Sequence, residues 1–516
     1  MKKATKPNKV AIASCTPYAT DAAAKTALRG GNAFDAAVAG AFDLMVSNPL
    51  MASLGGGGFA TVKVPGKEPV VFDFFDVMPG IGVHKNEFGK NIRTVSVPYG
   101  IGIDVITGYS SIGVPGTAKG LELVAKNFAN LEMKEILAPA IRHAREGVPL
   151  NATVAYWIGL SAEKIHWFTD YSKSLLSTDK GQVPTEGYLM KNPDLADTFE
   201  IISKEGTDII YTGDIAKKAS ELIREGGGLL TLEDLKNYQV IERKPLAAKY
   251  GNYKIYTNSP PSVGGLTLTQ MLKALSSLEY KGYDPDMVSK MGRIIYTALN
   301  DRYSLFKQGI RDFNALHQLV EDDYVTEKYA NIVPSPDTTQ ISCADDLGNA
   351  CSITMSIGYG SGVALEGTGI YFGNILGELE LNPFGFHALD PGMRLVSGMS
   401  PTIVFDEKSK DLIAIGSPGA SRIAPAIMQT ILNISDLGLS IEDALKMPRI
   451  HWEDGKFVIE SQMEVDMTHI PDDWEIVKFD GLDMYFGGVQ CVRLNKGTLT
   501  AASDPRRCGK SMVIEC

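Results

Sequence analysis

The sequence predicts a mixed α/β protein (α+β class) that folds as one interlocked body, and three observations lead to this prediction. Short apolar strands alternate with helices near the N-terminus, helical periodicity dominates from about 117 to 310, and strand-forming segments dominate from 338 to the end. The chain has 516 residues, 44% of them hydrophobic, so it can bury a large core. Because no disordered linker separates the helix-rich and strand-rich parts, we expect one body rather than separate domains.

The N-terminal elements are predicted from short apolar runs and from the glycines that separate them. Residues 9–14 form an apolar strand, and two helices follow over 18–29 and 33–47, separated by "RGGN". The second helix is rich in alanine, which suits burial against a sheet. The segment "LGGGGFATVKV" runs a four-glycine loop into a strand, and "VVFDFFDVMP" is predicted to be another strand. Further along, Thr231 is a predicted helix N-cap because acidic residues follow it.

The C-terminal third begins with a predicted β-hairpin. Its first strand runs from Thr339 to Ala344, its turn is Asp-Leu-Gly-Asn, and its second strand runs from Ala350 to Ser356. Cys343 and Cys351 lie on opposite arms, and we expect a buried pair of small thiols rather than a bridge. Helices are predicted near 423–437 and 441–447.

Composition narrows the classes of function. The net charge of −11 argues against a nucleic-acid partner. There is no signal-peptide-like apolar region and no run of 18 apolar residues, so we expect neither secretion nor a membrane span. Six scattered cysteines without a C-x-x-C pair fit reduced thiols in the cytoplasm. The histidines show no H-x-x-x-H pair and no carboxylate at ligand spacing, which disfavours a zinc site, and we expect no metal or organic cofactor.

Two glycine-rich loops are candidates for chemistry. "LGGGGF" lacks the lysine of a phosphate loop and leads into a strand, so close backbone packing or the lining of an active site is favoured over nucleotide binding. "GSPGASR" joins an apolar strand to a helix, where backbone N–H groups are good donors to an oxyanion. An ordinary turn capped by Ser417 or Ser421 is the alternative. No G-x-S-x-G elbow occurs, which disfavours a serine hydrolase of the α/β type.

Thr338, directly after the segment "PSPD", is a third candidate for chemistry. A threonine hydroxyl is a weak nucleophile unless a base lies beside it, and an N-terminal threonine supplies that base through its own α-amine. The α-amine titrates near neutral pH, at about 7.7 to 8.0. Chemistry at Thr338 therefore requires cleavage of the Asp337–Thr338 bond. Residue preference alone favours a purely structural role for these residues, since threonine suits strands and aspartate suits turns.

The whole chain resembles the γ-glutamyltranspeptidases, which are self-processing N-terminal-nucleophile hydrolases. The shared blocks occur in the same order and include "GGNAFDAAVA", "LGGGGF", "LLTLEDLKNYQVIERKPL", "SPPSVGGLTLTQML", "TTQISCADDLGNACSIT", "GSPGASRI" and "AASDPRR". The resemblance implies a four-layer αββα sandwich. It also implies a large subunit from residues 1–337 and a small subunit from 338–516, both cut from one precursor.

The resemblance also implies roles for individual residues. Thr338 is the nucleophile for self-cleavage and for catalysis, Ser356 stands where a hydroxyl hydrogen-bonds the nucleophile, and Gly419 and Ala420 give the oxyanion-hole N–H groups. The implied reaction forms an acyl-threonine intermediate and transfers a γ-glutamyl or related acyl group to water or to an amine.

The implied substrate contacts are less complete. Glu378 aligns with a carboxylate that holds the substrate α-amino group, and Ser397 matches the first of two serines that contact the substrate carboxylate. The second serine is Gly398 here. The family arginine that pairs with the same carboxylate is replaced by Phe75, which cannot make a charge-assisted bidentate contact. We therefore expect poor activity on γ-glutamyl anilides unless another arginine, such as Arg93 or Arg394, has taken over.

Several alternatives stay open at this stage. The scaffold could hydrolyse other small amides or γ-polyglutamate, or it could be an unprocessed, non-catalytic binding protein. The expected partner is a small-molecule amide. The sequence fixes neither the acyl acceptor nor the oligomeric state, for which a homo-oligomer is one option.

Overall fold

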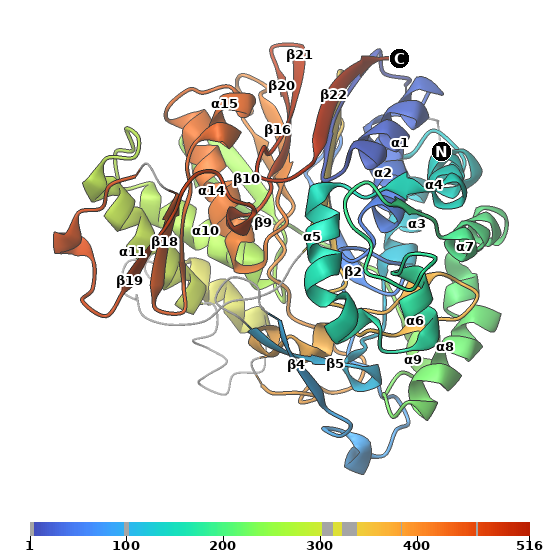
Figure 1. Cartoon of the computed structure of the whole chain (residues 1–516). Helices are drawn as coiled ribbons and strands as arrows, with labels where there is room; N and C mark the ends of the chain where they lie inside the picture. Colours follow the sequence, from blue (N-terminus) through green and yellow to red (C-terminus); the bar gives the residue numbers. More distant parts are fainter. Residues whose placement is uncertain (1–4, 98–102, 302–312, 322–337, 383, 461–462) are drawn as a thin grey trace.

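Two β-sheets pack face to face, and helices cover both outer faces (Figure 1). The computed structural model describes residues 5–97, 103–301, 313–321, 338–382, 384–460 and 463–516. The layers run helices, seven-stranded sheet, six-stranded sheet, helices. The predicted four-layer αββα sandwich is thus confirmed.

The seven-stranded sheet mixes strands from both ends of the chain. Its order is β22 (Lys510–Glu515), β1 (Lys9–Ser14), β11 (Thr339–Asp345), β12 (Ala350–Ser356), β2 (Gly57–Lys63), β3 (Val70–Asp73) and β8 (Ile241–Arg243). The N-terminal β1 lies between β11 and the C-terminal β22, antiparallel to both. Strands from before and after residue 338 therefore interleave in one sheet.

The six-stranded sheet takes two strands from the stretch that is predicted, and observed, to be mostly helical. Its order is β21 (Thr498–Ser503), β20 (Gln490–Asn495), β16 (Leu412–Gly416), β15 (Thr402–Phe405), β10 (Tyr253–Thr257) and β9 (Leu246–Tyr250). The strands β9 and β10 lie inside the stretch expected to be dominated by helices. They form a tight hairpin in which Tyr250 pairs with Tyr253 around Gly251, whose φ is +54°. Pairing with β15 stabilises this hairpin at the sheet edge, which a local pattern does not reveal.

Helices shield the two outer sheet faces. The seven-stranded sheet is covered by α1 (Pro17–Leu28), α2 (Ala33–Ser47) and α3 (Thr117–Phe128); α4 (Met133–Glu146) packs on α1 and α2, and α7 (Pro193–Glu205) packs on α4. The six-stranded sheet is covered by α10 (Val263–Leu275), α14 (Ile423–Ser435) and α15 (Ile441–Lys446), and α11 (Pro285–Asp301) packs on α10 (Figure 1). No helix in the described ranges is long and apolar enough to cross a membrane.

Smaller elements surround the two sheets. Among the described residues, the other α-helices are α5 (Ala152–Ser161), α6 (Asp170–Leu175), α8 (Asp214–Glu225) and α9 (Leu232–Asn237), and a π-helical turn spans Ala162–His166. The minor strands are β4 (Arg93–Val97), β5 (Ile103–Thr107), β6 (Val148–Pro149), β7 (Leu189–Met190), β13 (Ala364–Leu365), β14 (Ile370–Tyr371), β17 (Ile450–Glu453), β18 (Lys456–Glu460) and β19 (Glu475–Phe479).

Local sequence signals explain where several elements begin and end. Thr231 caps α9 by accepting a hydrogen bond from the Asp234 N–H at 3.1 Å, so that predicted N-cap is confirmed. The predicted strand "VVFDFFDVMP" is shorter than expected, since β3 stops at Asp73. There the Asp73 carboxylate accepts from the Phe75 N–H at 3.0 Å and from Arg243 Nε at 2.7 Å, which turns the chain out of the sheet.

The hairpin β11–β12 is buried on both faces, because it lies between helices and the second sheet. Its larger apolar side chains belong to the core under the helices, while Ser342 and Ser352 face the six-stranded sheet and donate to backbone carbonyls of Gln490 (3.0 Å) and Ile415 (2.9 Å). Cys343 stands opposite Cys351 and both thiols are free, as predicted.

Candidate active site

Thr338 lies at the start of β11, near the centre of the seven-stranded sheet, and only 3% of its surface is exposed. Thr339 pairs with Met355 in the antiparallel register, so Thr338 stands opposite Ser356, the last residue of β12. The Ser356 Oγ accepts a hydrogen bond from the Gly358 N–H at 2.8 Å, which fixes its orientation. The structure thus brings the two predicted hydroxyls together, and their mutual hydrogen bond stays a prediction. Asp337 lies outside the described residues.

A small pocket opens beside Thr338. The residues that line it come from six segments spread over 349 positions of the chain, and they are Phe75, Thr338, Ser356, Ile375, Glu378, Leu381, Ser397, Gly398, Met399, Ala420 and Ile423. Five of the six predicted site residues are in this set, and the sixth, Gly419, directly precedes Ala420. The constellation implied by the resemblance therefore converges on one cavity.

The loop "GSPGASR" has the geometry of a backbone donor site. It joins β16 to a single 3₁₀ turn (Ala420–Arg422) that leads directly into α14. Ala420 has φ +61°, a left-handed conformation that is uncommon for a residue with a side chain and that persists only where the surroundings enforce it. Gly419 has φ +125°, and a Cβ there would lie 2.8 Å from the Gly487 Cα. These features orient the Gly419 and Ala420 amides at a helix N-terminus, where anions are favoured.

The alternative that Ser417 or Ser421 caps this helix is wrong. The residue at the N-cap is Arg422 and no side chain caps α14. The Ser417 Oγ instead donates to the Pro418 carbonyl at 2.6 Å, and the Ser421 Oγ donates to Glu453 Oε1 at 2.7 Å. Both hydroxyls hold the loop in place, and neither caps the helix.

A buried ionic cluster lies beneath the loop. Arg422 Nη1 contacts Glu453 Oε1 at 3.0 Å, and the Tyr485 hydroxyl donates to Glu453 Oε2 at 2.7 Å. Burial opposes ionisation of Glu453, yet the Arg422 charge and the hydrogen bonds from Ser421 and Tyr485 outweigh it and hold the pKa of that carboxyl below its usual range. The cluster is therefore charged at neutral pH and anchors the strained Ala420 turn.

Gln340 couples this loop to the strand that carries Thr338. Its side-chain amide donates to the hydroxyls of Ser342 (3.0 Å) and Ser352 (2.9 Å) between the two sheets. It packs directly on Gly416, where a Cβ would lie 2.4 Å from the Gln340 side chain. The position at the end of β16 therefore favours glycine, and the packing fixes the distance between the strand that carries Thr338 and the loop that carries Gly419 and Ala420.

Glu378 and Ser397 are both buried in the pocket wall, at 2% and 1% exposure. Glu378 lies between two short 3₁₀ turns and packs against Gly358, where a Cβ would lie 1.9 Å from Glu378 Oε1. The Ser397 Oγ accepts from the Met399 N–H at 3.2 Å. Gly398 is open to a side chain, since its nearest neighbour to an added Cβ is the Ala420 carbonyl oxygen at 3.9 Å.

Phe75 occupies the pocket wall where the resemblance placed an arginine. Its ring is 1% exposed and stacks on Phe59, with centroids 5.6 Å apart and planes 21° from parallel. Neither arginine considered as a replacement lines the pocket. Arg394 donates to the Phe75 and Gln239 carbonyls and to Tyr238, while Arg93 donates to Thr107.

The four-glycine loop serves close packing, as the sequence indicated. Gly57 pairs with Ser356, and a Cβ on Gly57 would lie 2.4 Å from Asp76 Oδ2. Asp76 is buried, and no described group hydrogen-bonds its carboxyl oxygens. Burial raises the pKa of Asp76 well above its usual range, so the neutral acid is favoured next to the site.

Sequence reasoning missed the apolar part of the lining. Ile375 and Leu381 flank Glu378 in "ILGELEL", while Met399 lies in "SGMSPT" and Ile423 follows "GSPGASR". Each is within four residues of a predicted site residue. Proximity to a motif was therefore the available signal, but an apolar side chain beside a motif is indistinguishable from ordinary core until its neighbours are known.

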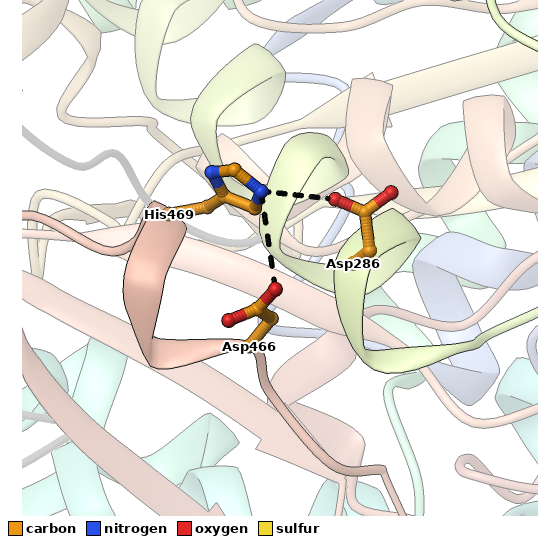
Figure 2. Close-up of side chains that lie close together, drawn as sticks. All are labelled: Asp286, Asp466 and His469. Carbon is orange, nitrogen blue, oxygen red and sulfur yellow. Dashed lines mark ion pairs between the residues drawn. The ribbon is translucent and has the colours of Figure 1, made fainter.

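A second polar cluster lies away from this pocket, on α11 and the turn around Asp466. Figure 2 shows His469 pointing toward Asp286 and Asp466, with Nε2 3.2 Å from Asp286 Oδ1 and 3.8 Å from Asp466 Oδ2. The expectation that no histidine has a carboxylate at ligand spacing is wrong here, because Asp466 precedes His469 by three residues. One potential ligand atom from each residue lies within 4.8 Å of the others. Lys290 Nζ contacts the other Asp286 oxygen at 2.5 Å, so the cluster is a partly exposed ion-pair network.

Comparisons with known proteins agree with this geometry. The family model for gamma-glutamyltranspeptidase matches residues 19–514. A glutathione hydrolase proenzyme of Bacillus subtilis (strain 168) is 30% identical over 562 aligned positions, covering 98% of this chain and 91% of that protein. An Acylase ACY 1 proenzyme of Pseudomonas sp. (strain SE83) is 29% identical, covering 96% and 92%. The crystal structure of cephalosporin acylase from Bacillus halodurans superposes with a TM-score of 0.81 at 26% identity, covering 99% and 96%. The chain belongs to the gamma-glutamyltranspeptidase family and is a divergent member of it.

Proposed function

We propose that the protein is a self-processing amide hydrolase or acyltransferase whose nucleophile is the Thr338 hydroxyl. The observation that carries this proposal is the single pocket in which Thr338, Ser356, Glu378, Ser397 and Ala420 meet. Membership of the family supports an N-terminal-nucleophile amidohydrolase or acyltransferase. Relatives named glutathione hydrolase and cephalosporin acylase support acyl chemistry at this site.

Self-cleavage is the first step of the proposal. The Thr338 Oγ attacks the Asp337 carbonyl carbon, the peptide C–N bond breaks, and an ester joins Asp337 to the threonine oxygen. Water then hydrolyses the ester, which releases the Asp337 carboxylate and leaves Thr338 with a free hydroxyl and a free α-amine. The products are a large segment ending at 337 and a small segment of residues 338–516.

Turnover uses the same hydroxyl. The new α-amine accepts the proton of the Thr338 hydroxyl as its oxygen attacks the substrate amide. The Gly419 and Ala420 N–H groups stabilise the oxyanion, and Ser356 orients the nucleophile. The amine leaves, an acyl-threonine ester remains, and water or a second amine releases the acyl group.

The test is cleavage and its dependence on one hydroxyl. Wild-type protein should give two bands on a denaturing gel, and the smaller should begin Thr-Thr-Gln-Ile on N-terminal sequencing. Thr338→Ala should remain one chain without activity. Thr339→Ala is the matched control: Thr339 is equally buried, but its hydroxyl accepts from Asn48 Nδ2 at 3.1 Å, so this variant should still cleave. A single 55.7 kDa band from wild-type protein would instead favour a non-catalytic binding protein.

A further inference from the structure

The described lining of the pocket contains an acidic side chain but no basic one. Among its lining residues only Glu378 has an ionisable side chain, and that residue is acidic. Its neighbours in the wall are the hydroxyls of Thr338, Ser356 and Ser397 and a set of apolar side chains. In the uncleaved chain, a ligand that enters this pocket therefore meets one buried acidic side chain and, among the described lining residues, no cationic side chain.

The buried arginines of this region are committed to other groups. Arg394 lies behind Phe75, where it donates to the Phe75 carbonyl, and its Nε lies 3.3 Å from Asp73 Oδ1. Arg422, two positions after Ala420, contacts Glu453 at 3.0 Å. Releasing Arg422 toward a ligand would leave the buried Glu453 carboxylate without its ionic partner, which is costly. Releasing Arg394 would break its contacts to Asp73, Tyr238 and backbone carbonyls.

These charges favour one kind of ligand. An ammonium group near Glu378 gains a charge-assisted hydrogen bond in a site that excludes water. A carboxylate in the same space meets a like charge and the Phe75 ring, and it loses its hydration without compensation. The pocket is small, so a short acyl chain suits it better than a drug-sized ligand.

We infer that the acyl group this protein transfers is short, carries an ammonium group and carries no carboxylate. The simplest example is a 4-aminobutanoyl amide, which is a γ-glutamyl amide without its α-carboxylate. This inference rests on the proposed function, since it assigns the acyl donor of the same Thr338 site.

Binding to the Thr338→Ala protein tests the inference without relying on catalysis. Calorimetry should compare 4-aminobutanamide, butanamide (no charge), L-glutamine (ammonium and carboxylate) and 4-aminopentanamide, in which a methyl group stands where glutamine has its carboxylate. We expect 4-aminobutanamide and 4-aminopentanamide to bind at least about tenfold tighter than either butanamide or glutamine. The methyl compound tests whether the pocket admits a neutral carbon substituent at the position where glutamine carries its carboxylate.

Two variants, each in the Thr338→Ala background, test the residues. Glu378→Gln should remove the preference for 4-aminobutanamide over butanamide. Phe75→Arg should improve glutamine binding about tenfold or more. If Phe75→Arg does not fold, Gly398→Ser, which the open space at Gly398 admits, adds a hydroxyl donor and should improve glutamine binding severalfold.

The outcomes separate this inference from the proposed function. Glutamine binding as tightly as 4-aminobutanamide, or butanamide doing so, would overturn the inference even if the wild-type protein cleaves itself. Failure of the wild-type protein to cleave itself or to hydrolyse any amide, with the ammonium preference intact, would overturn the proposed function and leave the ligand class standing.

Discussion

Replacing Arg394 by methionine tests whether the guanidinium behind Phe75 serves the fold or the substrate. Its Nη1 donates to Tyr238 at 2.9 Å and to the Phe75 carbonyl, its Nη2 donates to the Gln239 carbonyl at 2.8 Å, and its Nε lies 3.3 Å from Asp73 Oδ1. These contacts join the end of β3 to the segment after α9. Arg394→Met should therefore destabilise the fold and leave ligand preference unchanged.

The expected loss in the free energy of unfolding depends on the contacts that Asp73 keeps after Arg394 is replaced. Removing one partner of a buried ion pair costs about 3–5 kcal/mol when the other charge is left uncompensated. Asp73 keeps a second partner, since Arg243 Nε lies 2.7 Å from its Oδ2. We therefore expect a loss at the lower end of that range, about 3 kcal/mol in the free energy of unfolding. Arg394→Lys, which keeps the charge but cannot reach all the acceptors, should lose less.

Denaturant unfolding of the purified variants measures this loss. Arg93→Met is the matched control, because Arg93 is only partly buried and contacts Thr107 and the Lys164 carbonyl at the surface hairpin β4–β5; it should cost about 1 kcal/mol or less. The interpretation is refuted if Arg394→Met keeps its unfolding free energy within about 0.5 kcal/mol of wild type while KM rises selectively for carboxylate-bearing substrates.

Two further predictions concern the nucleophile and the acid response. Ser356→Ala should slow turnover of the processed protein by roughly 10² without changing its unfolding midpoint, because one positioned hydroxyl is lost; unchanged turnover would contradict the assigned role. His166 packs on Gly360, and burial together with the Arg93 charge lowers its pKa to about 3. The pKa of His166 is about 6.5 in the unfolded chain. Below that pH the unfolded chain binds a proton that the folded protein does not bind, so the free energy of unfolding falls as the pH drops. Between pH 6.5 and 5 the loss is about 2 kcal/mol, and His166→Phe should lose correspondingly less in denaturant unfolding at the two pH values; an equal loss in both proteins would rule His166 out.

Local patterns determined much of the fold. The hairpin around Gly348 follows from alternation and turn chemistry, and the start of α9 follows from the Thr231 capping box. Such features depend on residues a few positions apart, so the sequence encodes them directly. The ordered family blocks then located Thr338, Ser356, Glu378, Ser397 and the Gly419–Ala420 pair, which the structure places around one pocket or immediately beside it.

Other features were decided only by tertiary structure. Strands β9 and β10 are stabilised by pairing with β15, about 150 residues away, and the hydroxyls of Ser417 and Ser421 find partners that no helix-cap rule anticipates. Asp286 joins Asp466 and His469 across a similar separation. In each case the local residues permitted more than one outcome, and contacts distant in sequence selected one.

The character of the pocket is the clearest example. The sequence places Phe75 where the family has an arginine, and it leaves open whether Arg93 or Arg394 takes over the role of that arginine. The structure shows Arg394 bound behind Phe75 and Arg93 held at a separate hairpin, while Glu378 lies buried in the wall. Which charges reach a cavity depends on sheet register, on the direction of each side chain and on the partners that bind it first. The sequence by itself identified Thr338 as the candidate nucleophile, and only the packing of the two sheets decided which charges surround it.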